Sequence, residues 1–470
     1  MGSVVFDGKV ANNVKIAYVG GGSRGWARGM MSDLAVCKDM NGTVTLYDIN
    51  YPAAKVNEIV GGKINALPDA VSNFTYVATE TIGEALTGAD FVIISIMPGT
   101  YKEMQSYVHT PEKYGIWQPV GDSTGPGGVI RSLIAVPMFQ EIARAIREFC
   151  PDAWVINYTN PMTVCTRTLY KEFPEIKAFG CCHEVFGTQK ILAALVKDKY
   201  GIEVSRNEIR TNVVGVNHFT WVTKATYRNL DLYPLYRDHV EKWKTSHVEN
   251  IVDDNWMNKA FKDENDNSVK FDLFDRYGVI AAAGDRHLSE FCEASWYLDS
   301  PEQVIGKWHF RLTPVSWRVE ALEKWRTEQS RKIAAGEMEP EIQCTGEEGV
   351  SQMRALLGLG DLVTNVNLPN VGQIPNLPLG AVVESNACFT SGTVVPVQAG
   401  EIPPQIYNLV ARIAAEQEML IDAAFKRDLD LAFRAFINDP LVRLPMDEAR
   451  KLFDELVEES KPYLGEYLNK

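Results

Sequence analysis

The glycine-rich stretch YVGGGSRGW, residues 18–26, constrains the fold of this chain more than any other feature. It follows an apolar run that predicts a buried strand, and Gly20, Gly22 and Gly25 have the G-x-G-x-x-G spacing. Glycine here permits a tight turn, close approach of the backbone to a pyrophosphate, and close packing of the next helix on the strand. The candidate dinucleotide contacts in this turn are Gly20, Gly21, Gly22, Ser23 and Gly25.

A second strand-like segment, VTLYD, ends in Asp48. An acidic residue at the tip of the second strand can accept a hydrogen bond from a ribose hydroxyl, and its charge would repel the 2′-phosphate of NADP. We therefore predict that the cofactor is NAD. The motif leaves one alternative open, which is a glycine turn without a cofactor.

Short apolar runs alternate with helical patterns from Val14 to about Arg210, and this alternation predicts βα units around a parallel sheet. The predicted strands are VKIAYVG, VTLYD, FTYVAT, DFVIISI, WVINY and IKAFGCC, and helices are predicted at 53–67 and 130–150. The fold class is therefore α/β, a Rossmann-type doubly wound parallel sheet.

The pattern changes after Arg210, where the strand-like stretch IRTNVVGVNHFTWVTKATY precedes a polar region at about 236–267 and a long helical stretch at 406–436. A chain of 470 residues exceeds the usual size of one hydrophobic core. We predict two domains, an NAD-binding Rossmann domain over residues 1–210 and a second, α+β domain over residues 211–470.

The charge balance excludes two classes of partner. A formal net charge of −14 provides no electrostatic footprint for nucleic acid or for an anionic membrane surface. The N-terminal residues MGSVVFDGKVANN have neither the basic nor the apolar region of a signal peptide, and no apolar run reaches the ~18 residues of a membrane span. We expect a cytoplasmic protein with mostly free thiols and a small-molecule substrate.

Two polar stretches follow predicted strands or precede a predicted helix: GDSTGPGG, which contains Asp122, and NYTNP, which contains Asn160. Ligands of doubly wound sheets collect at the carboxyl ends of the strands. Asp122 and Asn160 are therefore candidate substrate contacts. A structural loop and an ordinary proline turn are the competing interpretations.

Two residues of metal-binding type also lie at strand ends, Cys182 in CCHE and His218 in GVNHF. Neighbouring side chains on a strand point to opposite faces, so Cys181 and Cys182 cannot both enter one site. A thiolate and an imidazole suit a borderline-soft divalent metal and leave positions for substrate oxygens and water. The competing interpretation is a buried cysteine that only packs.

Five motifs occur in the order found in family 4 glycoside hydrolases: the glycine turn, GDSTGPGG, NYTNP, CCHEVFG and GVNHF. The chain resembles this family over essentially its whole length, including ESNA near Glu384. CHEVFGTQ and GDRHLSEF are similar to the bacterial α-galacturonidase branch. The resemblance implies a fold like that of lactate and malate dehydrogenases, a homodimer or homotetramer, and Mn²⁺ bound by Cys182 and His218.

The resemblance also implies a redox route to hydrolysis, an exception to the usual pair of carboxylates. NAD⁺ oxidises C3 of the sugar, the resulting ketone acidifies the C2 proton, a base removes it beside the metal, the C1 group is eliminated, and water then adds. Phospho-glycosidase members have an aspartate acid after the metal cysteine. His183 occupies that position here, so the acid is open and a 6-phosphate substrate is less expected.

The stretch YGVIAAAGDRHLSE contains three candidate bases, Asp285, His287 and Tyr277. Asp285 is preferred because a carboxylate near an acidified C–H need not be strongly basic. A galacturonide has a C6 carboxylate that a guanidinium can bind in bidentate fashion, and Arg286 and Arg131 are the candidates. A surface-loop, core or structural ion-pair role remains open for each of these residues.

Three other functions remain as alternatives. An α-galactosidase or α-glucosidase would share every motif except the carboxylate pocket. A hydroxy-acid dehydrogenase would need a histidine acid/base paired with an aspartate beside the nicotinamide. A non-catalytic NAD-binding protein would bind the cofactor without Mn²⁺-dependent turnover.

Overall fold

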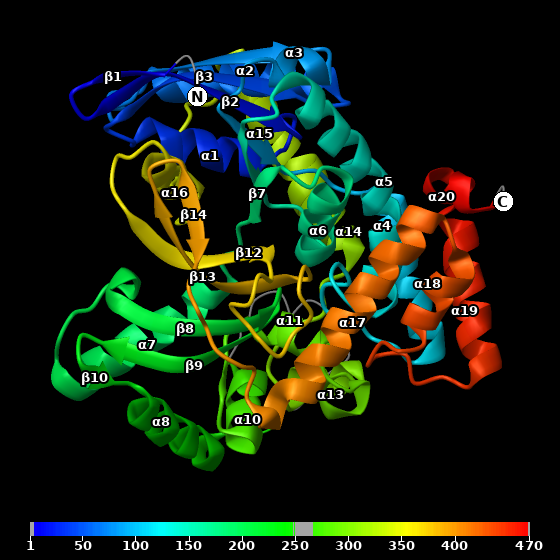
Figure 1. Cartoon of the computed structure of the whole chain (residues 1–470). Helices are drawn as coiled ribbons and strands as arrows, with labels where there is room; N and C mark the ends of the chain where they lie inside the picture. The colour runs from blue at the N-terminus through cyan, green and yellow to red at the C-terminus, as the bar shows by residue number, and fades with distance from the viewer. Residues whose placement is uncertain (1–3, 248, 250–266, 469–470) are drawn as a thin grey trace.

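A ten-stranded sheet frames the first half of the molecule, and the computed structural model describes residues 4–247, 249 and 267–468 (Figure 1). Its six parallel strands have the order β4-β3-β2-β5-β6-β7, and β1 pairs antiparallel with β2. These seven strands are β1 Val5–Asp7, β2 Val10–Val19, β3 Met40–Tyr47, β4 Phe74–Thr79, β5 Phe91–Ile94, β6 Trp154–Asn157 and β7 Lys177–Gly180. The order of the parallel strands is that of a Rossmann fold, which confirms the predicted fold class.

Helices cover both faces of this sheet, which is why its central strands β5 and β6 are buried at every residue. In β2, Ile16 and Tyr18 pack with one set of helices, while Ala17 and Val19 pack with the other. The first set comprises α1 Trp26–Ala35, α2 Tyr51–Asn65 and α16 Gly349–Leu356, and the second comprises α3 Ile82–Leu86, α5 Gly125–Phe149 and α6 Met162–Glu172. The predicted helices at 53–67 and 130–150 are α2 and α5.

Three antiparallel strands from late in the chain extend the same sheet beyond β7. They are β12 Leu362–Pro369, β13 Val382–Thr390 and β14 Thr393–Pro396, and β12 meets β7 at the pair Asn367 and Gly180. The addition of these late strands to the first sheet was not predicted from the sequence. The division into domains at residue 210 stays a prediction, and the two halves of the chain share one sheet.

A smaller, four-stranded antiparallel sheet lies below the large one in Figure 1. Its strands are β8 Ile209–Val216, β9 Phe219–Tyr227, β10 Leu230–Asp231 and β11 Ile280–Ala281. The stretch IRTNVVGVNHFTWVTKATY is therefore two strands of a hairpin, with Val216 paired to Phe219 and His218 in the turn. Most of the predicted polar region at 236–267 lies outside the described residues, and the part before 248 forms the end of α8 Tyr233–Ser246.

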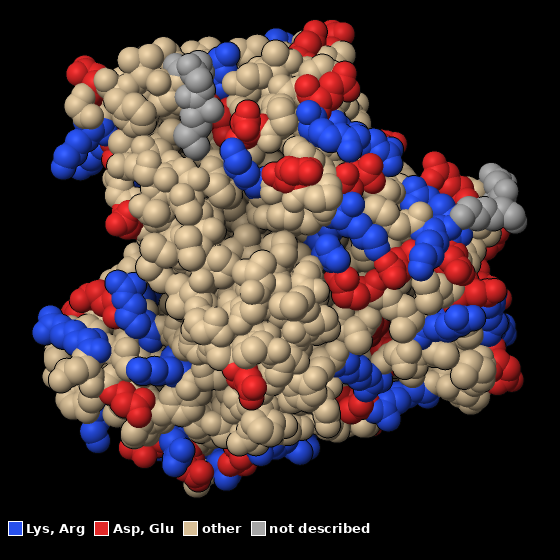
Figure 2. Space-filling model, in the orientation of Figure 1, with Lys and Arg blue, Asp and Glu red and all other residues tan. Residues whose placement is uncertain are grey.

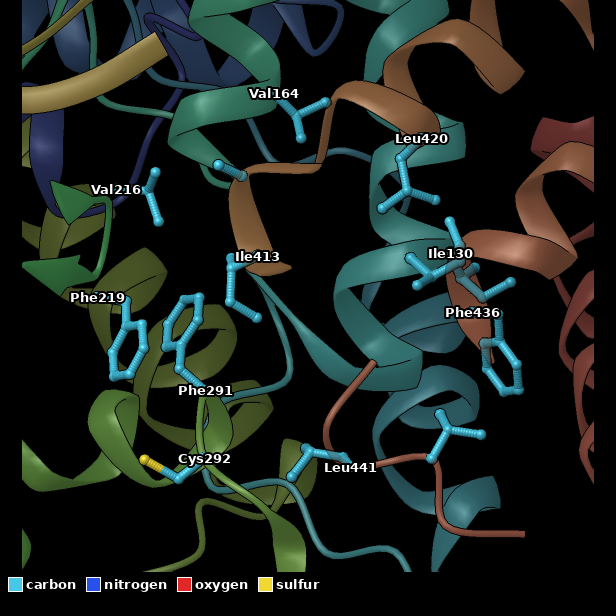
Figure 3. Close-up of a cluster of buried hydrophobic side chains, with 14 of the residues drawn as sticks. Ile130, Val164, Val216, Phe219, Phe291, Cys292, Ile413, Leu420, Phe436 and Leu441 are labelled. Carbon is cyan, nitrogen blue, oxygen red and sulfur yellow. The ribbon is translucent and has the colours of Figure 1, made fainter. Parts of the chain in front are cut away.

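The remaining helices bury a large apolar cluster between the second half of the chain and α5. Figure 3 shows Ile130 of α5 near Phe436, with Phe219 and Phe291 farther into the cluster. Helix α7 Glu184–Tyr200 follows β7, and the later helices include α10 Ser268–Tyr277, α11 Asp285–Glu290, α14 Val315–Arg318, α17 Pro404–Lys426, α18 Leu429–Phe436, α19 Met446–Glu459 and α20 Lys461–Leu468. This arrangement brings α7, α10 and α11 near the carboxyl ends of the parallel strands.

The predicted helical stretch at 406–436 is two helices. Arg427 has a φ of +53° and ends α17, and the Asp428 carboxylate caps α18 by accepting a hydrogen bond from Leu431 N at 2.9 Å. The sequence has no glycine at this break, so the apolar periodicity continues through it.

No helix in the described part of the chain is long and apolar enough to cross a membrane. Figure 2 shows basic and acidic side chains next to one another around the edge of the visible face, whose centre carries few charged side chains.

Candidate active site

The glycine turn lies where the strand order of the large sheet reverses, between the carboxyl ends of β2 and β5. Gly20 has a φ of +95°, and a Cβ there would lie 2.1 Å from the carbonyl oxygen of Ser95. Gly22 N donates to Asp48 Oδ2 at 2.9 Å, and Gly25 directly precedes α1. The turn therefore has the close backbone approach and the adjacent acidic residue of a dinucleotide site.

The side chain of Asn57 in α2 fixes the conformation of the turn by two hydrogen bonds. Its Nδ2 donates to the carbonyl oxygens of Gly21 and Ser23 at 2.8 and 2.9 Å. The N–H groups from Gly20 to Ser23 are bonded within the protein, to the carbonyl oxygens of Tyr47 and Gly20 and to Asp48. An anion would therefore meet the first turn of α1, where no side chain caps the helix.

A cleft of about 890 Å³ opens beside the N-terminus of α1. It is lined by residues from both halves of the chain, among them Gly25, Trp26, His183, Glu184, Lys270 and Glu347. Ligands in α/β folds bind at such a switch point, so this cleft is the candidate active site.

Asp122, His218 and His287 form a buried cluster whose potential ligand atoms all lie within 4.8 Å of one another. The two imidazole rings stack with centroids 3.9 Å apart. His218 Nδ1 faces Ser123 Oγ at 3.3 Å, while the buried Nδ1 of His287 has no hydrogen-bond partner among the described residues. A carboxylate and two imidazoles at this spacing can hold a divalent cation.

Burial sets the charge of the two imidazoles in this cluster. It lowers the pKa of His218 to about 3 and also lowers the pKa of His287. Burial opposes the charge of Asp122 as well, but the Arg131 guanidinium and the hydrogen bond from Ser123 hold the pKa of this carboxyl below its ordinary value. The site therefore presents neutral imidazoles, the form that binds metals, beside a carboxylate.

Cys182 and Cys181 enter different environments. The Cys182 thiol is buried beside the Asn217 side chain, one residue before His218, and burial raises its pKa well above the ordinary value. Cys181 belongs to the apolar cluster on the other side of the sheet, near Tyr158. Of these two cysteines, Cys182 alone therefore lies next to the residues around His218.

The sequence-predicted acid and bases lie in three settings. His183 lines the cleft, and its Nδ1 is 2.6 Å from Glu347 Oε1, a contact that raises the pKa of His183. Asp285 is fully buried, and its oxygens accept hydrogen bonds from Val269 N at 3.0 Å and Lys270 N at 3.1 Å. Tyr277 lies elsewhere, packed edge-on against Trp221.

Arg131 and Asn160 join the polar network around Asp122. Asn160 Nδ2 donates to Asp122 Oδ2 at 3.2 Å, and Arg131 Nε donates to the Asn160 carbonyl oxygen at 2.9 Å. Arg131 Nη1 donates to the hydroxyl of Tyr107 at 2.8 Å. Arg131 therefore has partners within the protein on both sides of its guanidinium.

Arg286 is less fully paired. Its Nη2 donates to the Pro119 carbonyl oxygen at 2.9 Å and contacts Thr313 Oγ1, but its buried Nε has no partner among the described residues. Burial, together with the positive charge of Arg318, lowers the pKa of Arg286 to about 10. Two guanidiniums close together in a buried place favour a bound anion.

Three residues of this region, of which Lys270 and Glu290 are buried and Glu184 is partly buried, were not singled out from the sequence. Glu184 accepts a hydrogen bond from Gly284 N at 2.8 Å, and Glu290 accepts from Val120 N at 2.7 Å. Lys270 lines the cleft. Glu184 was visible in the letters CCHE, but Lys270 and Glu290 stand in ordinary helical patterns that give no sign of a site.

The fold and the site define an α/β enzyme of dinucleotide-binding type with a buried candidate metal centre beside the cofactor cleft. The chain belongs to the family 4 glycosyl hydrolases. The model of this family matches residues 15–198, and the model of the family's C-terminal domain matches residues 213–442.

Similar proteins cover nearly the whole chain. An α-galacturonidase of Thermoanaerobacterium saccharolyticum is 56% identical over 459 residues, which are 97% of this chain and 98% of that protein. A solved structure from Bacillus subtilis is 49% identical, has a TM-score of 0.87, and covers 95% of this chain and 100% of its own. A 6-phospho-α-glucosidase from gut microorganisms, solved with NAD and Mn²⁺, shares the fold at 18% identity and a TM-score of 0.77, covering 96% and 99% of the two chains.

Proposed function

We propose that this chain is an NAD- and Mn²⁺-dependent glycosidase that hydrolyses α-galacturonides. The observation that carries the proposal is the incompletely paired Arg286 directly before His287 of the Asp122, His218 and His287 cluster. The Arg286 guanidinium is a cation that can bind the carboxylate of a substrate, and it lies next to the candidate metal centre. The similarity to an α-galacturonidase over nearly the whole chain supports the same substrate.

The residues of the cleft fit NAD. The uncapped N-terminus of α1 suits a pyrophosphate, and Asp48, which is partly exposed, can accept a further hydrogen bond from a ribose hydroxyl. Bound NAD⁺ supplies the oxidising equivalent that converts C3 of the sugar to a ketone.

The buried cluster fits Mn²⁺, because it offers oxygen and nitrogen ligands and an unsatisfied buried imidazole nitrogen. Asp122, His218 and His287 would hold the ion, with Cys182 as a further ligand. Bound Mn²⁺ supplies Lewis acidity to the sugar oxygens. The protein's part is to keep both imidazoles neutral, which their burial achieves.

His183 is proposed as the group that protonates the leaving oxygen. It lies in the cleft, and the contact with Glu347 favours its protonated form, so it can hold a proton near neutral pH. Its half-exposed position also lets it recover a proton from water after each turnover.

Arg286 is proposed as the side chain that binds the C6 carboxylate. Arg131 is the weaker candidate, since Tyr107 and Asn160 already occupy its donors. Arg318 at the end of α14 contacts the same segment as Arg286, since its Nη2 lies 3.4 Å from the Val120 carbonyl oxygen and Arg286 binds that of Pro119. It can share the negative charge of the substrate.

The substrate is tested with p-nitrophenyl α-galacturonide and the corresponding α-galactoside, in the presence of NAD⁺, Mn²⁺ and a thiol reductant. We expect faster release from the galacturonide. Arg286→Met should lower kcat/KM for the galacturonide about 10- to 100-fold, the value of a hydrogen bond to a charged group, and leave the galactoside nearly unaffected.

Arg144→Met is the matched control, because this arginine pairs with Glu172 on the surface of α5. It should behave like the wild type on both substrates. Faster release from the neutral sugar by the wild type would favour the α-galactosidase alternative. Reduction of NAD⁺ by hydroxy acids without glycoside cleavage would favour a dehydrogenase.

Asp48→Ala is expected to weaken NAD⁺ binding about 10- to 100-fold, because it removes an ionic acceptor for the ribose and for Gly22 N. Quenching of tryptophan fluorescence during NAD⁺ titration measures the Kd. Asp69→Ala, at an exposed position after α2, should leave it unchanged. Equal affinity in Asp48→Ala would remove Asp48 from the cofactor site.

A homodimer or homotetramer and a cytoplasmic location stay predictions. Light scattering of the purified protein tests the first, and fractionation of the native cells tests the second.

A further inference from the structure

Lys270 is a buried charged residue for which the proposed function has so far given no role. It is the third residue of α10, is 1% exposed, and lines the cleft with Glu184 and Gly284. Its backbone N–H donates to Asp285. Its Nζ makes no hydrogen bond or ion pair with any residue that the structure describes.

Such a lysine is costly unless its charge is used or removed, because a buried ammonium loses its hydration. Asp285 and Glu184 are the charged groups that face it, and both favour the ammonium form. Burial outweighs them and lowers the pKa of Lys270. A lowered pKa increases the share of the neutral amine, which is the form that a general base requires.

The other candidate bases are engaged elsewhere. Both oxygens of Asp285 accept backbone N–H groups at the start of α10. His287 belongs to the Asp122, His218 and His287 cluster, and Tyr277 packs against Trp221. Among these residues Lys270 alone lines the cleft, and it does so beside the proposed acid His183.

We propose that Lys270 is the base that removes the C2 proton of the sugar, an inference that rests on the proposed function. The lone pair of Nζ takes the proton, the electrons of the C2–H bond form a C2–C3 double bond, and the oxygen of the C3 ketone takes the negative charge. NAD⁺ is the oxidant that has accepted the C3 hydride. The enolate then expels the C1 leaving group, which takes a proton from His183, and a C1–C2 double bond forms. Water adds at C1, the ammonium returns a proton to C2, and the hydride would return to C3.

The test uses a galacturonide deuterated at C2 with the full-length enzyme loaded with NAD⁺ and Mn²⁺. The wild type should release the label to solvent and show a primary isotope effect. Lys270→Met should still oxidise C3, so reduced nicotinamide accumulates and is seen by its absorbance. Loss of the C2 label should fall at least about 100-fold, as expected for a missing general base.

Lys270→Arg separates charge from basicity, because a guanidinium keeps the positive charge but is not deprotonated in proteins. It should fail in the same exchange assay. Lys270→Ala should regain exchange when small primary amines are added. Lys63→Met, which removes a lysine bound to the Ile333 carbonyl oxygen away from the cleft, should exchange like the wild type.

Label loss at the wild-type rate in Lys270→Met or Lys270→Arg would overturn the assignment. So would a Lys270→Met enzyme that keeps exchange but no longer distinguishes galacturonide from galactoside, since Lys270 would then bind the carboxylate. Unchanged NAD⁺ affinity and circular dichroism establish that each variant is folded. A wild type that neither cleaves nor exchanges would contradict the proposed function itself, whatever the variants do.

Discussion

Replacement of His218 by alanine is expected to lower kcat for an α-galacturonide at least about 1000-fold and to remove the strong Mn²⁺ site. The metal contributes several kcal/mol to stabilising negative charge on the sugar, and each 1.36 kcal/mol corresponds to about tenfold in rate. His218 is buried, neutral, and within 4.8 Å of the ligand atoms of Asp122 and His287. Calorimetric titration with Mn²⁺ and turnover at increasing Mn²⁺ measure the two effects.

His239→Ala is the matched control, because this histidine of α8 packs on the Phe271 ring of α10, so its replacement should not change Mn²⁺ affinity. Cys182→Ser should lose Mn²⁺-dependent activity, while Cys181→Ser, in the apolar cluster, should keep most of it. Wild-type Mn²⁺ affinity in His218→Ala would disprove the cluster as the metal site. Equal losses in the two cysteine variants would remove the distinction between them.

The Rossmann half could be predicted because its strands are buried on both faces. Such strands read as short, continuous apolar runs, as FVII of β5 does with every residue buried. The return of β12–β14 to the same sheet could not be predicted, because nothing local in residues 362–396 specifies a partner almost 200 residues away. The break between α17 and α18 was missed because Arg427 adopts the left-handed conformation without a glycine.

The motifs at strand ends were predicted as candidates because the carboxyl ends of parallel strands meet at one edge. Asp122, His218 and His287 come from three separate parts of the chain, and the fold brings them together. Lys270 could not be found in this way. Its significance depends on burial beside a cleft, and the surrounding letters NSVKFDLF describe only an amphipathic helix.

Asp285→Ala is expected to lower the free energy of unfolding by about 3–5 kcal/mol, the usual cost of removing one partner from a buried charged network. Asn267, the residue before α10, makes no capping hydrogen bond with its side chain. Asp285 caps α10 instead, because its carboxylate accepts hydrogen bonds from Val269 N and Lys270 N. Its loss leaves two buried donors unsatisfied and takes a counter-charge away from Lys270. Urea denaturation followed by circular dichroism measures the change.

Asp428→Ala provides the comparison, since Asp428 caps α18 by the same kind of bond at a less buried position. That variant should lose only about 1 kcal/mol. If Asp285→Ala instead unfolds at the wild-type urea concentration but no longer exchanges the C2 label, Asp285 acts in the chemistry and not in the fold. Asp285 would then be the preferred base again. If Asp285 only anchored α10, its replacement would have to lower the stability of the protein.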